Sequence, residues 1–292
     1  MSAAGKIFDE EINRFVEAYL AERERLLEGH VARRRAAAEA LIEGEHLHQA
    51  RAEEDLGVDL QQFHVGMVFS FTRSASGEQR EQIVRHCVRQ LQLHQGSSLS
   101  LPEGRDCLWA WVSGPTLPTA ESLRSLKSPL AHSTITRWSI GEPAFGLEGF
   151  RRTHLQARDI HTLFARTGQP QLPTDASRGS SVSLWEDHAL TSLMGQNVER
   201  ACWFVQSVLG PLSEDSLQAE ELRRTLLAYL DSGLSLIRTG QSRNVHRNTV
   251  VYRVQRIEEL LAHRIKDRAL ELHCALLLVN QFRAAVLHPP AQ

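Results

Sequence analysis

Residues 245–261, VHRNTVVYRVQRIEELL, combine an apolar stripe with a polar, arginine-rich opposite side when placed on a helix. At roughly 100° of rotation per residue, the side opposite the stripe carries Asn248, Thr249, Tyr252, Arg253 and Arg256. Asn can form two hydrogen bonds with adenine, Arg two with guanine, and a Thr methyl can contact the thymine methyl. Tyr and Thr hydroxyls and further arginines can bind phosphate oxygens. These residue types are therefore suited to recognition of double-stranded DNA.

The segments upstream are those needed to present such a helix to DNA. Residues 222–233 form a predicted helix with a glycine stop, residues 234–244 contain a short second helix, and a turn is predicted near Asn244. Helix, short helix, turn and long helix make a helix-turn-helix, whose last helix enters the major groove with its N-terminal residues facing base edges. Arg247, in the first turn of the long helix, and Arg243, before that helix, are further candidates for DNA contacts. Periodicity alone is equally compatible with a plain packing helix held by Val250, Val254, Ile257 and Leu261.

Charge is unevenly distributed along the second half of the chain. The whole chain has a formal net charge of −2, so it is not a polycation. Residues 186–231 contain eight acidic and three basic side chains, whereas residues 235–268 contain eight basic and three acidic ones. A basic cluster on one short helical unit is typical of a protein that binds the phosphate backbone. Charge alone is equally compatible with a solvated face of scattered arginines.

Length and composition limit the classes of protein to consider. A chain of 292 residues is expected to form about two domains. Its 42% hydrophobic and 23% charged residues are ordinary for a soluble globular protein. The four cysteines form no C-x-x-C pair, which favours reduced thiols over a disulfide or metal framework. No signal sequence or membrane-spanning stretch is evident, so we expect a cytoplasmic protein without metal, cofactor or membrane contact.

The middle of the chain has a different pattern. Its predicted order is β-α-β-β-α-β-α, with strands near residues 63–71, 97–101, 107–114 and 136–141 and helices near residues 77–95, 120–131 and 146–167. Split βαβ units in this order favour one antiparallel sheet with helices on a face. We therefore expect an α+β protein with an N-terminal helical region at 1–60, a sheet domain at 61–168, a linker at 169–182, and an all-α domain at 183–292 that holds the helix-turn-helix at about 220–280.

Two stretches resemble a known family. VHRNTVVYRVQRIEELL followed by DRALELHCALLL, within residues 222–278, resembles the C-terminal helix-turn-helix of PucR/CdaR-type transcriptional regulators. SIGEPAFGLEGFRRTHLQARDIHTLFA, which begins at Ser139, is similar to the end of the domain that precedes it in many members, a degenerate relative of the GGDEF cyclase domain. The resemblance implies a DNA-binding regulator, with an unidentified small-molecule effector as a further option. Because one helix-turn-helix reads only a few base pairs, we expect a homodimer or larger homo-oligomer.

The second helix of the predicted helix-turn-helix departs from the family pattern. That helix is usually alanine-rich and ends in a leucine, whereas this chain reads LIRTGQSRN, with Gly240 at a usual alanine and Arg243 at the apolar anchor. Glycine costs about 0.5–1 kcal/mol in a helix interior, and an arginine cannot be buried unpaired. Two alternatives follow: Arg243 points outward and adds a phosphate contact, or the unit is loose without DNA.

The middle domain is not predicted to be an enzyme. A GGDEF-type cyclase would carry paired glycines followed by acidic residues at its central hairpin, where this chain reads LPEGRDCLW. We therefore nominate no catalytic residue, and the leading hypothesis is a transcriptional regulator. Two other hypotheses remain: a nucleotide-binding signalling protein built on the GGDEF-like domain, and a protein–protein interaction module without DNA binding.

Overall fold

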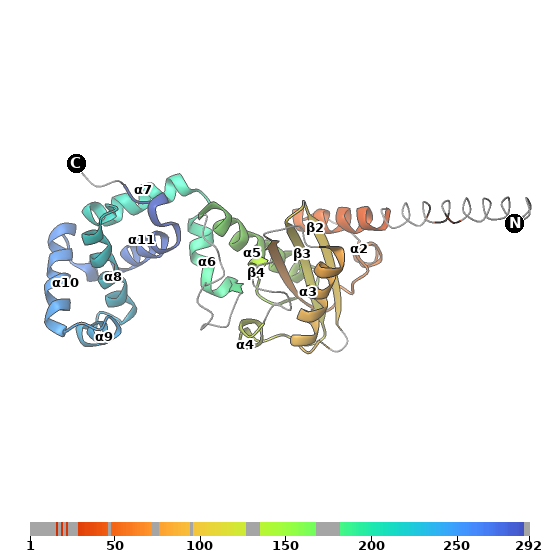
Figure 1. Ribbon diagram of the computed structural model, residues 1–292, viewed down its shortest axis with the longest axis horizontal. Helices are drawn as coiled ribbons and strands as arrows, with labels where there is room; N and C mark the ends of the chain where they lie inside the picture. The colour runs from red at the N-terminus through yellow and green to blue at the C-terminus, as the bar shows by residue number, and fades with distance from the viewer. Residues whose placement is uncertain are drawn as a thin grey trace, which may run out of the picture. The chain divides into compact units, whose positions relative to one another are not determined.

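The computed structural model describes Val16, Tyr19, Glu22 and residues 29–45, 48–71, 76–93, 96–126, 135–167 and 182–288 (Figure 1). The predicted linker at 169–182 falls almost wholly outside these residues, as does most of the chain before residue 29. The chain forms two compact units. We call them the sheet unit, residues 1–161 and 170–187, and the helical unit, residues 162–169 and 188–292. The fold class is α+β, as the sequence predicts.

The sheet unit contains the β-α-β-β-α-β-α order predicted for the middle of the chain. Residues 29–43 are helical ahead of it. The named elements are α2 (Gln49–Leu56), β1 (Phe63–Phe71), α3 (Gly77–Gln90), β2 (Ser97–Glu103), β3 (Cys107–Gly114), α4 (Ala120–Arg124), β4 (Ile135–Ile140), β5 (Ala144–Phe145), α5 (Gly146–Thr167) and β6 (Ser183–Leu184). The part of the predicted helix at 120–131 that follows residue 126 lies outside the described residues.

The sheet differs from the predicted one at its edge. Its strand order is β2-β3-β1-β4-β6, and β5 pairs with β1. All pairs are antiparallel except β4 with β6, which run parallel. Residues 183–292 are expected to form the C-terminal domain, whereas in the structure Ser183–Leu184 extend this sheet. A two-residue strand has no periodicity of its own, so only the contact with β4 identifies it.

Helices cover both faces of the sheet, which corrects the expectation of one covered face. On one face, α3 and α4 contribute Ile83, Cys87 and Leu123 to a core with Phe69 and Trp138 of the sheet. On the other, the helix at 29–43, together with α2 and α5, packs on β2 and β3; this second core includes Leu41, Leu56, Leu99, Trp111 and Phe150. Strands that are buried on both sides read as nearly continuous apolar runs, as β1 does in FHVGMVFSF.

Helix α5 approaches the sheet very closely at two glycines. The hydroxyl of Thr153 accepts a hydrogen bond of 2.8 Å from the backbone N–H of Gly66 in β1. A Cβ added at Gly66 would lie 2.6 Å from the backbone nitrogen of His154, and one at Gly141 would overlap the carbonyl oxygen of Thr153. Since no side chain fits between helix and strand at these points, the two glycines set the depth at which α5 is seated.

His154 is buried between aromatic rings under α5. Its ring centroid lies 4.6 Å from that of Trp111 and 4.7 Å from that of Trp109. Neither ring nitrogen has a hydrogen-bond partner among the described residues. Burial, with a smaller contribution from the charge of Arg158, lowers the pKa of His154 to about 3. Burial also lowers the pKa of His161 to about 4, with the charge of Arg137 adding to the effect.

These histidines predict a pH dependence of stability. Below pH 6.5 His154 is protonated in the unfolded chain but stays neutral in the folded protein. The free energy of unfolding therefore falls as the pH drops from about 6.5 toward 3. We expect His154 alone to cost about 2 kcal/mol of unfolding free energy between pH 7 and pH 5. Urea unfolding at both pH values should show a smaller loss in His154→Gln than in the unchanged protein. An identical loss in the two proteins would contradict the assignment.

The helical unit contains the predicted helix-turn-helix within a bundle. Its elements are the part of α6 (Trp185–Met194) from residue 188, α7 (Val198–Leu209), η1 (Gly210–Ser213), α8 (Leu217–Asp231), α9 (Leu236–Ser242), α10 (Arg247–Leu261), η2 (Ile265–Arg268), α11 (Ala269–Phe282) and η3 (Arg283–Ala285). Within this unit α8 lies between α10 and α11 (Figure 1). No helix among the described residues is long and apolar enough to cross a membrane.

Candidate nucleic-acid interface

The three helices of the candidate interface have clear local start and stop signals. The side chains of Ser216, Ser235 and His246 accept hydrogen bonds from the first turns of α8, α9 and α10. Such N-caps satisfy N–H groups that have no partner within the helix. Between α9 and α10, Asn244 has a φ of 54°, a left-handed conformation that asparagine tolerates better than most residues. The turn predicted near Asn244 is therefore confirmed.

Helix α10 has the two sides that its sequence predicts. Val250 and Ile257 are fully buried, and Val254 and Leu261 pack against the core that contains Ile257. Four of the candidate residues are exposed on the helix, namely Arg247, Asn248, Tyr252 and Arg256. Tyr252 is 70% exposed, which is a high value for a large aromatic side chain. Thr249 is half-buried next to this exposed face.

Among the described residues, Arg256 alone of the four exposed candidates has a side-chain hydrogen-bond partner. Its Nη1 donates a 3.0 Å hydrogen bond to Glu259, one turn further along the same helix. Both side chains are exposed, at 45% and 66%. A solvated ion pair of this kind contributes roughly 0–1 kcal/mol, so a phosphate or base could displace Glu259 at little cost.

The other two candidates, Arg243 and Arg253, point toward α8. The Nη1 of Arg253 lies 2.6 Å from the carboxylate of Glu221 and donates to the hydroxyl of Thr225 at 3.1 Å. The Nη2 of Arg243 lies 3.5 Å from the same carboxylate oxygen. The arginine side chains are 28% exposed for Arg243 and 21% for Arg253. One acidic side chain therefore links the two helices that flank the turn.

This network answers the question raised by Arg243 with an arrangement that neither alternative described. The guanidinium is not turned fully outward, and the charge of Glu221 neutralises it at the anchor position, although its buried Nε has no hydrogen-bond partner among the described residues. Glu221 and Thr225 were not among the predicted site residues. No local pattern indicates them, since Glu221 lies 32 residues from Arg253 along the chain.

Gly240 has a steric reason to be a glycine in this structure. It is buried in α9, and the backbone N–H of Val245 donates a 2.9 Å hydrogen bond to its carbonyl oxygen. A Cβ at this position would lie 2.9 Å from the carbonyl oxygen of Val245. The turn between α9 and α10 therefore packs directly against Gly240. Glycine lowers the helix propensity of α9, but it allows this close contact with the turn.

In the hairpin between β2 and β3 of the sheet unit, the acidic residue Glu103 forms a contact within the protein. Glu103, at the end of β2, forms an ion pair with Arg35 from the preceding helix. Arg35 also donates to the carbonyl oxygen of Pro102 at 2.7 Å and lies over the ring of Trp109. In the part of the chain that the structure describes, no three His, Cys, Asp or Glu side chains gather in a way that could hold a metal ion.

Comparison with known protein families gives two matches. Residues 222–278 match the PucR C-terminal helix-turn-helix domain. Residues 43–163 match the GGDEF-like domain, so this match begins within the helices that precede β1. Together the two matched regions include β1 to β5, most of α8, and the helices α9 and α10.

The chain is also similar to individual proteins. It is 36% identical over 78 residues to the purine catabolism regulatory protein of Bacillus subtilis, which is 27% of this chain and 15% of that protein. It is 30% identical over 123 residues to the transcriptional activator PmfR of Paenarthrobacter nicotinovorans, 41% of this chain and 25% of that protein. The chain thus matches a quarter or less of the length of these two relatives.

Comparison with solved structures gives a match of low similarity. The regulator of polyketide synthase expression from Bifidobacterium adolescentis is 20% identical, with 85% of this chain and 92% of that chain covered and a TM-score of 0.40.

Proposed function

We propose that this chain, which combines a PucR-type C-terminal helix-turn-helix domain with a GGDEF-like domain, is a transcriptional regulator that binds operator DNA through α10. The observation that carries the proposal is the exposed face of α10. The side chains of Arg247, Asn248 and Tyr252, all in the first two turns, are exposed to solvent, while the opposite side of the helix packs against the core. These positions suit a recognition helix, whose N-terminal residues meet base edges. The names of the two curated relatives, a catabolism regulator and a transcriptional activator, support the same role.

We further propose how the parts of the chain divide this work. The helix-turn-helix lies in the helical unit, and the sheet unit holds protomers together or responds to a signal. One helix-turn-helix reads only a few base pairs, so two copies on adjacent half-sites are the usual way to gain affinity and site length. A homodimer or larger homo-oligomer is therefore part of the proposal, as are regulation without catalysis and a cytoplasmic location.

Fluorescence anisotropy tests this function directly. The purified chain is titrated with DNA from upstream of its own gene and with scrambled DNA of equal length and composition, each at two salt concentrations. We expect the upstream DNA to bind more tightly, and we expect affinity for both to fall steeply with salt because bound cations are released from the phosphates. Absence of binding at both salt concentrations would favour a surface for a protein partner.

Glu221 predicts a specific change in DNA binding. Replacement by glutamine removes the charge that neutralises Arg243 and Arg253, so one or both guanidinium groups become available to phosphates. We expect tighter non-specific binding at low salt and a salt dependence steeper by about one unit of log–log slope for each phosphate gained. Glu199→Gln, an equal charge change on the exposed side of α7, serves as the control. A slope unchanged from wild type would mean that both arginines act only within the protein.

A further inference from the structure

We propose that the helical unit holds a small-molecule site between α8 and α11, which takes a monoanionic ligand with an apolar body, such as an aromatic carboxylate. The site is a pocket of about 370 Å³. That volume lies within the range of roughly 300–1,000 Å³ in which proteins bind small molecules. The inference deepens the proposed function, since it gives the regulator an effector site on the helix that supports α10.

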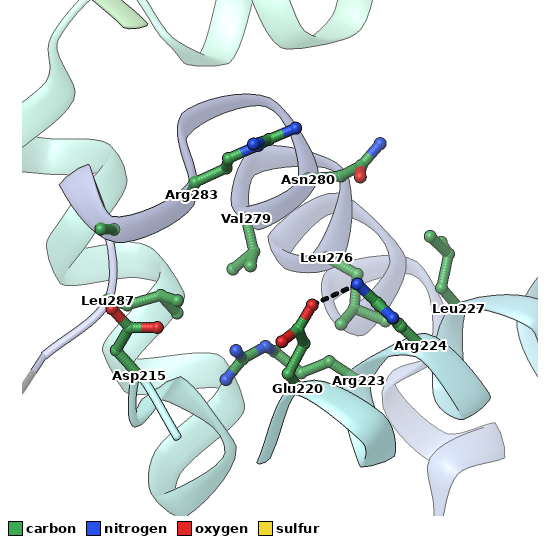
Figure 2. Close-up of a pocket in the computed structure, with 11 residues that line it drawn as sticks. Asp215, Glu220, Arg223, Arg224, Leu227, Leu276, Val279, Asn280, Arg283 and Leu287 are labelled. Carbon is green, nitrogen blue, oxygen red and sulfur yellow. Dashed lines mark ion pairs between the residues drawn. The ribbon is translucent and has the colours of Figure 1, made fainter. Parts of the chain in front are cut away.

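The pocket has an apolar floor. Leu227 from α8, Leu276 and Val279 from α11, and Leu287 after η3 line it (Figure 2). Leu276 is 3% exposed and belongs to the core of the unit, so the floor is fixed by the packing that holds the bundle together. Rigid apolar side chains of this kind favour a flat or branched hydrocarbon body over a fully polar ligand.

The charges around the pocket leave one positive group uncompensated. Glu220 forms an ion pair with Arg224 (Figure 2). Arg223 is 5% exposed, donates to the carbonyl oxygens of Leu212 and Glu214 at 2.6 Å each, and is attracted by the charges of Asp215 and Glu220.

Arg283, by contrast, forms no ion pair with any described residue. With three arginines and two carboxylates in the lining, the pocket has one positive charge in excess. A single carboxylate on the ligand would balance it, and the side-chain amide of Asn280 is available beside Arg283 as a further donor.

The backbone at Arg283 is strained. It has a φ of 49° and a ψ of −128°, in a region that glycine adopts readily and residues with a Cβ rarely do. Such a conformation is energetically unfavourable for a residue with a side chain and is most often found at functional sites. Here it terminates α11 and sets the position from which the guanidinium of Arg283 reaches the rim of the pocket.

Helix α8 connects the pocket to the candidate DNA interface. One side of α8 contributes Glu220, Arg224 and Leu227 to the pocket, and another contributes Glu221 and Thr225 to the contacts with Arg253 of α10. Glu220 and Glu221 are adjacent in sequence. A ligand that draws Arg224 away from Glu220 or shifts the first turns of α8 would therefore act on the helix that holds α10 in place.

Isothermal titration calorimetry of the whole chain with 2-naphthoate, and with its uncharged analogue 2-naphthamide, tests the site. We expect saturable binding of 2-naphthoate that is at least about ten-fold tighter than that of the amide, as a charged hydrogen bond contributes. Arg283→Gln should abolish this preference, and Ala284→Trp, a change at an exposed lining residue, should abolish binding of both compounds. Arg200→Gln, at an exposed arginine outside the pocket, should leave both affinities unchanged.

Two results would overturn the site. One is the absence of saturable binding of 2-naphthoate at millimolar concentration. The other is binding that both Arg283→Gln and Ala284→Trp leave unchanged. Neither result touches the proposed function, because operator binding is measured separately by anisotropy. Conversely, if 2-naphthoate bound with the expected preferences and the chain did not bind DNA, the ligand site would be supported and the proposed function as a transcriptional regulator would be contradicted.

Discussion

Replacement of Asn248 and Arg256 together by alanine is expected to weaken binding to operator DNA by about 2–4 kcal/mol, a loss of roughly 30-fold to 1,000-fold in affinity. Both side chains are exposed on α10 and lie two turns apart, so each change removes a separate contact and the two losses should nearly add. The change at Asn248 is expected to remove hydrogen bonds to a base. The change at Arg256 is expected to remove a charged contact with a base or phosphate.

The same variant should keep the stability of the helical unit. Asn248 contributes only its backbone N–H to the cap at His246, and Arg256 has only an exposed ion pair. Arg200→Ala, which removes an equal charge from α7, provides the matched control and should bind DNA as wild type does. Anisotropy with operator and scrambled DNA measures the affinities, and urea unfolding measures the stability. Wild-type operator affinity in the double variant would rule out this face of α10 as the DNA-binding surface.

Gly141→Ala is expected to destabilise the sheet unit by about 3 kcal/mol, the upper end for a methyl group forced into a packed core. The added Cβ would overlap the carbonyl oxygen of Thr153, which belongs to the backbone of α5 and cannot rotate away. The backbone N–H of Gly141 also donates a 3.0 Å hydrogen bond to the carbonyl oxygen of Gly66, so a shift of Gly141 would disturb β1 as well.

Gly77→Ala is the matched control for this change. Gly77 begins α3, and a Cβ there meets nothing within 4 Å. An alanine at this position should leave stability unchanged or raise it by up to about 1 kcal/mol, because the unfolded chain loses conformational freedom. Tryptophan fluorescence during urea unfolding follows the sheet unit, which contains four of the five tryptophans. Equal stability of the two alanine variants would contradict the close seating of α5.

The parts of the fold that the sequence predicts well are those with strong local signals. The order of strands and helices from β1 to α5 follows from apolar runs that alternate with turn residues, and the structure confirms it apart from the two-residue strand β5, which was not predicted. The buried stripe of α10 follows from helical periodicity because Val250 and Ile257 lie on one side. The turn at Asn244 follows from the conformational tolerance of asparagine. Each of these depends on residues that are close together in the chain.

The features that were missed depend on partners that are far apart in the chain. Arg243 and Arg253 have the same sequence signature as exposed arginines, and only Glu221 on α8 shows that both are held within the protein. The second face of the sheet is covered by α5 together with the helices that precede β1, and the charged composition of those preceding helices does not indicate which surface they pack on. The parallel pairing of β6 with β4 joins residues more than 40 positions apart. No periodicity within a window of a few turns encodes such contacts.

Protection of guanine N7 from methylation by dimethyl sulfate would test the central proposal most directly, because N7 lies in the major groove. With upstream DNA saturated by the protein, we expect protected guanines within a short site, and we expect that protection to disappear in the Asn248→Ala, Arg256→Ala variant at concentrations where it still binds DNA non-specifically. Saturated DNA whose guanines all remain reactive, or protection that persists unchanged in the variant, would contradict the placement of α10 in the major groove.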